Sequence, residues 1–232
     1  MISNVVVLIP SYNPDEKLPL LIAELREVFS HVVVVDDGST TGLSVFDMIR
    51  SEGGGVEVVV HPRNRGKGAA LKTGFRWIQS HYPEIDGIVT ADSDGQHRPN
   101  DIEKIAKALL SPQSGIVLGV RAFTGEVPLR SRLGNGATRL LFRLLTGVPI
   151  SDTQTGLRGI PLKMIPRLLE IPGDRYEYEM RMLADCKFHS DKPVQVSIET
   201  VYVKGNASSH FRPIVDSVKI WSALIRYVIL KK

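Results

Sequence analysis

Two aspartates, Asp92 and Asp94, are separated by a single residue at the end of an apolar segment. Residues 88–91 are Ile-Val-Thr-Ala, an uncharged and partly β-branched run that predicts the end of a buried strand. Carboxylates at alternate positions of an extended backbone point to the same side. Such a pair suits a hard divalent cation, which prefers oxygen ligands, and Gln96 and His97 are further candidate ligands beside it.

An Asp-x-Asp tripeptide also occurs in plain acidic turns, so its place in the chain decides how it is interpreted. Open α/β sheets bind ligands outside the carboxyl ends of their strands, which is where residues 92–97 are expected. Three further residues lie in loops after the predicted strands. Asp37 could accept a hydrogen bond from a base or ribose, Tyr12 could flank the base, and Lys67 could contact phosphate.

Two common phosphate-binding motifs are missing from these loops. The segment before Lys67 is not a P-loop, because His61 stands where a P-loop requires glycine. Residues 10–13 are Pro-Ser-Tyr-Asn, so the first loop lacks the glycines of a dinucleotide-binding fingerprint.

The elements that position these loops are short apolar strands that alternate with amphipathic helices. This alternation predicts an α/β fold with a largely parallel sheet covered by helices on both faces. We expect strands at residues 5–9, 31–35, 56–60, 88–91, 115–120 and 194–203, and helices at 17–29, 41–49, 69–79, 102–110, 175–188 and 213–230.

The composition is that of an ordinary globular protein. The chain has 232 residues, of which 43% are hydrophobic and 23% are charged, so one α/β domain accounts for it. Cys186 is the single cysteine, which excludes an internal disulfide and suits a reducing compartment. The N-terminus lacks the basic region of a signal peptide, and no uncharged run is long enough to predict a membrane-spanning helix.

The second half of the chain is rich in arginine and leucine. Arg139 and Arg143 are four residues apart, so they share one face of a predicted helix, with leucines expected on the other. Residues 151–158 form a polar loop that is long for a simple connection. The C-terminal helix is amphipathic, and its Trp221 and Tyr227 favour a membrane interface.

Taken together, four motifs resemble those of family 2 glycosyltransferases of the GT-A (Rossmann-like) fold, and they occur in the order seen there. The motifs are Pro-Ser-Tyr-Asn at 10–13, Val-Asp-Asp-Gly-Ser at 35–39, Asn-Arg-Gly-Lys-Gly-Ala at 64–69 and Asp-Ser-Asp-Gly-Gln-His at 92–97. Three features of the second half are similar to the dolichyl-phosphate-mannose synthase and polyprenyl-phosphate glycosyltransferase branch. They are Arg-Ser-Arg at 130–132, Asp-Thr-Gln-Thr-Gly-Leu-Arg at 152–158 and the helix with Glu177 and Glu179. The chain departs from the pattern at Pro14 and at residues 204–206, and within these 232 residues we expect no C-terminal transmembrane helices like those of many bacterial relatives.

The resemblance implies that a sugar is transferred, with inversion, from a UDP- or GDP-linked donor to a polyprenyl or dolichyl phosphate. It implies a Mg²⁺ or Mn²⁺ ion held by Asp92, Asp94 and Gln96, and a donor site formed by Pro10, Tyr12, Asn13, Asp37, Lys67, Asp92, Ser93 and Asp94. The expected catalytic residues are Asp94, Asp152 and Arg130. A phosphate acceptor is already ionised near neutral pH and needs a cationic clamp, for which Arg121, Arg130 and Arg132 are the candidates. Asp152 would then orient an arginine, although a role as general base stays open.

We expect a single domain over residues 1–232, with a nucleotide-sugar half at about 1–120, an acceptor half at about 121–212 and the amphipathic helix at 213–232. We expect a cytoplasmic protein that binds peripherally to the cytoplasmic face of the membrane. We do not expect it to bind nucleic acid. A separate membrane-protein partner and a homo-oligomer stay open. Two other functions also stay open: transfer to a saccharide or other soluble hydroxyl acceptor, and nucleotide-sugar binding without turnover.

Overall fold

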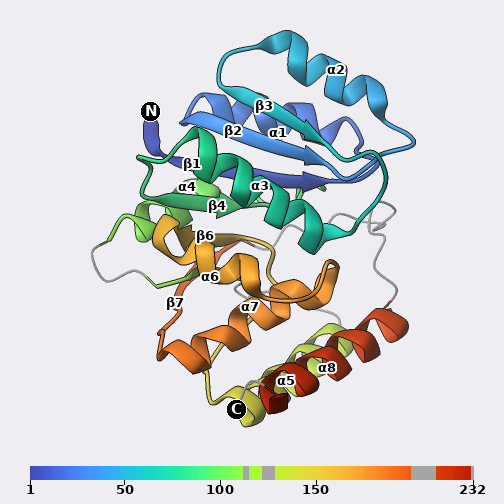
Figure 1. Cartoon of the computed structure of the whole chain (residues 1–232), viewed down its shortest axis with the longest axis vertical. Coiled ribbons are helices and arrows are strands. Elements are labelled where there is room, and N and C mark those ends of the chain that lie inside the picture. Colours follow the sequence, from blue (N-terminus) through green and yellow to red (C-terminus); the bar gives the residue numbers. More distant parts are fainter. Residues whose placement is uncertain (112–114, 122–128, 200–212, 231–232) are drawn as a thin grey trace.

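The computed structural model describes residues 1–111, 115–121, 129–199 and 213–230. Within these residues, seven strands form one sheet in the order β3-β2-β1-β4-β6-β5-β7 (Figure 1). The strands are β1 (Ile2–Ser11), β2 (Phe29–Asp36), β3 (Val56–Val60), β4 (Gly87–Thr90), β5 (Val117–Arg121), β6 (Arg158–Pro161) and β7 (Val194–Ile198). β6 runs antiparallel to β4 and β5, and the other pairs are parallel, so the prediction of a mostly parallel sheet is confirmed.

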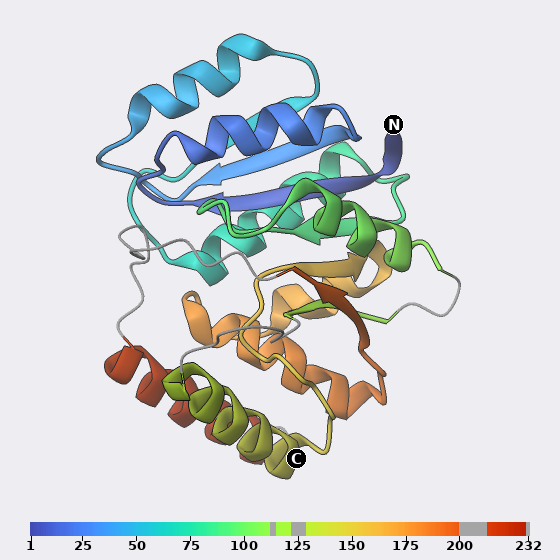
Figure 2. The same cartoon turned by 180° about the vertical axis from the view of Figure 1, so that it is seen from behind.

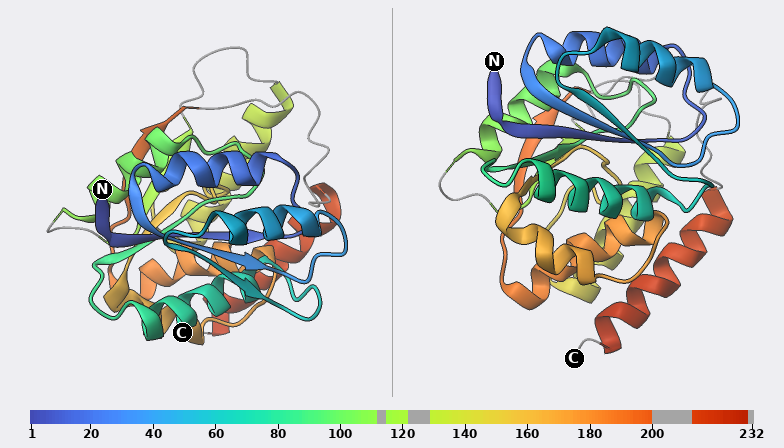
Figure 3. Two further views of the ribbon diagram at one scale, coloured as in Figure 1. Left: turned by 90° about the horizontal axis from the view of Figure 1, so that it is seen from above. Right: turned by 45° about the horizontal axis from the view of Figure 1, so that its top comes forward.

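Helices cover both faces of the sheet (Figure 3). On one face, Val5 and Val7 of β1 pack with α1 (Lys17–Arg26), α2 (Leu43–Glu52) and α4 (Pro99–Leu109). On the other face, Val6 and Leu8 pack with α3 (Lys67–His81), α6 (Ile165–Glu170) and α7 (Tyr176–His189). Because successive side chains of a strand point to opposite faces, an uninterrupted apolar run such as residues 5–9 serves both layers.

Two long helices, α5 (Leu129–Thr146) and α8 (Pro213–Leu230), lie side by side beyond α7 (Figures 1 and 2). Phe142 and Leu224 are buried, whereas Leu140 and Leu144 are 60% and 74% exposed. The core therefore covers only part of the apolar side chains of α5, and Leu140 and Leu144 face the outside. No helix in the described part of the chain is long and apolar enough to cross a membrane.

Several element boundaries differ from the sequence-based expectations, and one strand was not expected. The first helix ends at Arg26 instead of residue 29, because Phe29 pairs with Ile2 and opens β2. β6 was not predicted, since it is only four residues long and begins with a charged residue, Arg158. The last strand ends at Ile198, and residues 200–203 of its predicted range lie outside the described residues.

Candidate active site

The carboxyl ends of β1, β2 and β4 meet at one edge of the sheet, and a cavity of about 990 Å³ opens there. Arg158 reaches the same edge because β6 is antiparallel and pairs Arg158 with Thr90, the last residue of β4. The loop before β6 is thereby brought to the cavity. Nine predicted site residues line it, namely Pro10, Tyr12, Asp37, Lys67, Asp92, Ser93, Asp94, Gln96 and Arg121.

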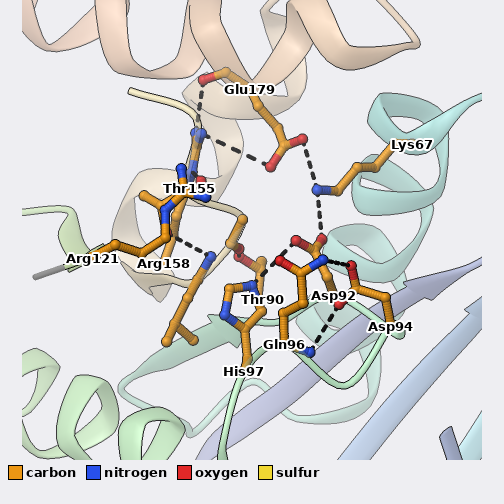
Figure 4. A network of polar contacts seen from close by, with 12 residues as sticks. Lys67, Thr90, Asp92, Asp94, Gln96, His97, Arg121, Thr155, Arg158 and Glu179 are labelled. Carbon is orange, nitrogen blue, oxygen red and sulfur yellow. Dashed lines mark hydrogen bonds and ion pairs between the residues drawn. The ribbon is translucent and has the colours of Figure 1, made fainter. Parts of the chain in front are cut away.

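The two aspartates of the acidic motif have different surroundings (Figure 4). Asp92 lies 2.6 Å from the Lys67 ammonium and 3.2 Å from Nε2 of His97. Asp94 instead accepts hydrogen bonds from the backbone and side-chain nitrogens of Gln96, at 3.0 and 2.8 Å. Burial and the neighbouring charge of Asp92 raise the pKa of Asp94. Burial also opposes the charge of Asp92, but Lys67 and His97 outweigh it and lower the pKa of that carboxyl.

Lys67 lies between two carboxylates. Its ammonium is 2.6 Å from Asp92 and 2.9 Å from Glu179 of α7 (Figure 4). Burial opposes the charge of Lys67, but the two carboxylates outweigh it and raise its pKa. Glu179 is held in turn by Arg158, whose Nη1 donates to the Glu179 carbonyl oxygen at 2.7 Å. Sequence reasoning gave neither Glu179 nor Arg158 a role in the site.

Asp37 is almost completely buried at the base of the cavity. Its carboxylate accepts hydrogen bonds from the backbone N–H groups of Arg65 and Gly66, at 2.9 and 2.7 Å, and lies 2.7 Å from Nδ1 of His61. A carboxylate has about four lone-pair sites, so three partners leave one for a ligand. Asp37 therefore holds the start of α3 in place as well as facing the cavity.

Asn13 is a predicted donor residue that does not line the cavity. Its side-chain oxygen accepts hydrogen bonds from the backbone N–H groups of Thr40 and Thr41, and its own N–H donates to the Ser39 hydroxyl. Its φ of 51° is in the left-handed region, which asparagine tolerates better than most residues. Asn13 thus ties the loop after β1 to the loop after β2.

Arg121 and Asp152 form a bidentate ion pair at the other side of the cavity. Nε and Nη2 of Arg121 donate to the two oxygens of Asp152 at 2.6 and 3.0 Å, and the backbone N–H of Gln154 also donates to Asp152. Asp152 is buried and Arg121 is partly exposed. Arg130 and Arg132 lie near the start of α5, and their side chains are outside the part that the structure describes.

Helix α8 supplies a wall of the cavity that the sequence did not predict. Ile220 and Trp221 line the cavity together with Lys219, and so does Thr138 of α5. Tyr227 is buried and donates a hydrogen bond to Asp185 of α7 at 2.8 Å. The expectation that Tyr227 contacts a membrane is therefore wrong, because its side chain is buried against α7.

The residues present fit a hard divalent cation. Asp92, Asp94 and Gln96 offer oxygen ligands at one place, and the Lys67 ammonium already lies against Asp92 as a cation would. The described residues contain no group of three or more His, Cys, Asp or Glu side chains suited to a metal ion, so the two carboxylates would hold the cation together with phosphate oxygens and water.

Comparison with known proteins identifies the family. The model of glycosyl transferase family 2 matches residues 6–162. The chain is 26% identical over 219 residues to UDP-N-acetylglucosamine–dolichyl-phosphate N-acetylglucosaminyltransferase of Methanococcus voltae, which covers 85% of this chain and 86% of that protein. It is 32% identical over 163 residues to undecaprenyl-phosphate mannosyltransferase of Micrococcus luteus, covering 67% and 65%.

A solved structure agrees with the predicted fold. Glucosyl-3-phosphoglycerate synthase from Mycobacterium tuberculosis, crystallised with Mn²⁺, UDP and glucosyl-3-phosphoglycerate, superposes with a TM-score of 0.70 at 18% identity. The match covers 98% of this chain and 79% of that one. The GT-A fold, the resemblance to the polyprenyl-phosphate branch and the enzyme class predicted from the motifs are confirmed. The chain belongs to glycosyltransferase family 2 and is a glycosyltransferase.

Proposed function

We propose that this glycosyltransferase transfers a sugar from a UDP- or GDP-linked donor to a polyprenyl phosphate, with inversion at the anomeric carbon. The observation that carries the proposal is the composition of one cavity, which joins an acidic motif and Lys67 on one side to Arg121 and the apolar α8 wall on the other. The first side suits a diphosphate, and the second suits a phosphate that carries an apolar chain. The names of the two family relatives, which act on dolichyl and undecaprenyl phosphate, support the same acceptor class.

The donor half would hold the nucleotide through its loops. Tyr12 and the remaining lone pair of Asp37 are the groups for the nucleoside, and Lys67 is the cation for the diphosphate. Asp92, Asp94 and Gln96 would hold a Mg²⁺ or Mn²⁺ ion, which acts as a Lewis acid toward the departing diphosphate. The Mn²⁺ and UDP in the crystallised structural neighbour support this choice of ligands.

Arg121 would bind the acceptor phosphate, with Asp152 fixing the plane of its guanidinium. Both oxygens of Asp152 accept hydrogen bonds from Arg121, which favours orientation over proton abstraction. An ionised phosphate is already a nucleophile and needs no strong base. A soluble hydroxyl acceptor would need one, so the pairing of Asp152 favours the phosphate acceptor.

The outer side of α5 and α8 would rest on a membrane surface, where a polyprenyl phosphate keeps its chain. We call the exposed apolar side chains of these two helices the apolar α5–α8 surface; they are Leu140, Leu141, Leu144, Ile225, Ile229 and Leu230. Exposed cations, Arg139, Arg143 and Arg226, belong to the same two helices and suit anionic lipid.

The experiment that tests the proposal is product analysis with matched acceptors. The full chain is incubated with a panel of UDP- and GDP-sugars and Mn²⁺, together with undecaprenyl phosphate, 3-phosphoglycerate or a free hexose. We expect a new glycosyl phosphodiester of the lipid phosphate. Transfer to the free hexose alone would support the soluble-acceptor alternative. Binding of a donor without any product would support a non-catalytic role.

A further inference from the structure

Lys67 is placed to act as a cation for two anions at different times. Its ammonium lies 2.6 Å from an oxygen of Asp92, a residue assigned above to the divalent ion, and 2.9 Å from an oxygen of Glu179. The exposed fractions of the three side chains are low, at 21% for Lys67, 31% for Asp92 and 11% for Glu179. Water therefore screens these contacts poorly. A divalent ion that binds Asp92 must therefore compete with a charge that is already there.

We propose that Lys67 takes the place of the divalent ion while that ion is absent. Its ammonium then neutralises Asp92, and Glu179 keeps the ammonium in the site when the ion binds. The inference rests on the proposed cation site at Asp92 and Asp94. Asp92 is partly buried, and its other close partner is His97, so a resident ammonium offsets the cost of desolvating its charge while the site is empty. Once Asp92 binds a divalent ion, the Lys67 ammonium no longer pairs with Asp92. It stays beside Glu179 and can bind the donor diphosphate.

Glu179 is a positioning residue in this scheme because its own place does not depend on Lys67. Its carbonyl oxygen accepts a 2.7 Å hydrogen bond from Arg158, and the same guanidinium lies 3.9 Å from its carboxylate. Arg158 is fixed further by a 3.0 Å hydrogen bond to the Thr155 carbonyl oxygen. Glu179 thus stays beside Lys67 when Asp92 changes partner.

The proposal predicts effects of opposite sign for one substitution, measured by calorimetry with Mn²⁺ alone and with UDP at saturating Mn²⁺. For Lys67→Met, Mn²⁺ alone should bind about tenfold more tightly, because its competitor is gone, whereas UDP should bind about tenfold more weakly. In chelator the melting temperature of Lys67→Met should fall, and Mn²⁺ should raise it by more than it raises that of the wild type. The matched control is Lys72→Met on the same helix, where the ammonium contacts Asp174 and the Gly173 carbonyl oxygen and not Asp92.

Glu179→Gln is the second variant, and it serves if Lys67→Met does not fold. Lys67 then has Asp92 as its carboxylate partner, so Mn²⁺ alone should bind more weakly than in the wild type. Unchanged or weaker Mn²⁺ binding by folded Lys67→Met, or unchanged Mn²⁺ binding by Glu179→Gln, would overturn the proposal. If the wild type binds no Mn²⁺ with or without UDP, or if Asp94→Asn binds it as well as the wild type does, the cation site itself is wrong and the inference falls with it.

Discussion

The imidazole of His61 holds the carboxylate of Asp37, with Nδ1 and Oδ1 2.7 Å apart and both side chains at most 5% exposed. Because the carboxylate is an acceptor, Nδ1 of His61 carries the proton, and Nε2 lies 2.9 Å from the hydroxyl of Thr73 on α3. Asp37 also binds the two backbone N–H groups directly before Lys67. A buried polar chain therefore links the end of β2 to the start of α3.

Replacing His61 with asparagine should weaken nucleotide binding although His61 does not line the cavity. Asparagine cannot reach both Asp37 and Thr73, and a buried group that loses its hydrogen bond costs about 1–3 kcal/mol. We expect a lower melting temperature and UDP binding weaker by about tenfold, measured by calorimetry. The acceptor KM should stay the same. The control is His81→Asn, at an exposed histidine of α3 that stacks on Trp77. Normal UDP affinity in folded His61→Asn would contradict the linking role.

Removal of divalent ions should abolish transfer, and Mg²⁺ or Mn²⁺ should restore it. Asp94→Asn should lose most turnover while keeping its fold, since the substitution preserves size and removes one of the two carboxylates. Burial raises the pKa of Asp94, so loss of its charge should not destabilise the protein in chelator. Radiolabelled sugar transfer and the melting temperature are the two measurements. Full activity in chelator would refute a metal requirement.

The sequence predicted most residues of the donor side of the cavity, because each of them follows the end of a strand. Asp37, Asp92 and Asp94 lie within four residues of the last residue of β2 or β4, so local patterns were enough to bring them to one edge. Glu179 and Arg158 were missed for a different reason. Glu179 comes to Lys67 through the packing of α7 on the sheet, and Arg158 comes through an antiparallel strand too short to predict. Such placements depend on contacts between residues far apart in the chain.

The leucines of α5 and α8 show the same limit of prediction from sequence. Periodicity correctly predicted that residues 213–230 form an amphipathic helix, but it could not say which apolar side chains the sheet would cover. Leu224 is buried and Leu144 is exposed, although both belong to apolar runs in long helices. The register of α5 and α8 against α7 decides this, and register is a tertiary property.

Changing Arg121 to lysine should raise the acceptor KM and leave UDP binding unchanged. Lysine keeps the charge but loses the two parallel hydrogen bonds that Arg121 makes with Asp152. Asp152→Asn should act in the same direction, because it removes the orienting charge. The diagnostic quantity is kcat at saturating acceptor, which Asp152→Asn should lower only modestly. A loss of kcat by a factor of about 100 or more, the range of a general base, would instead identify Asp152 as a base.

Gly156→Ala should disable the acidic motif without a change of backbone. A Cβ at this position would lie 2.3 Å from an oxygen of Asp92, so the carboxylate must move. We expect weak Mn²⁺-dependent transfer and a folded protein, measured by activity and circular dichroism. Gly136→Ala is the control, because its Cβ would meet no atom within 4 Å and alanine favours a helix. Wild-type activity in Gly156→Ala would show that Asp92 can move without loss of Mn²⁺-dependent transfer.

The apolar α5–α8 surface should bind anionic vesicles directly. Leu140, Leu144 and Ile229 are 60%, 74% and 59% exposed, and burying each in a lipid interface is worth roughly 1.5–3 kcal/mol at most. The triple change of these residues to serine should therefore lose most co-sedimentation with vesicles that contain phosphatidylserine. Trp221→Ala is a poorer probe, since Trp221 lines the cavity and packs against the core.

The control for this experiment is a pair of exposed leucines on the opposite part of the molecule, Leu20 of α1 and Leu43 of α2, which are 63% and 53% exposed. Their change to serine removes exposed apolar side chains of the same kind from another surface and should leave vesicle binding intact. Binding should also weaken as salt rises, because each Lys or Arg near anionic lipid adds about 1 kcal/mol that ions screen. If the wild type does not sediment with anionic vesicles at low salt, or if both sets of serine variants bind equally, docking through α5 and α8 is wrong. The proposed lipid acceptor would then require a membrane-protein partner that brings the enzyme to the membrane.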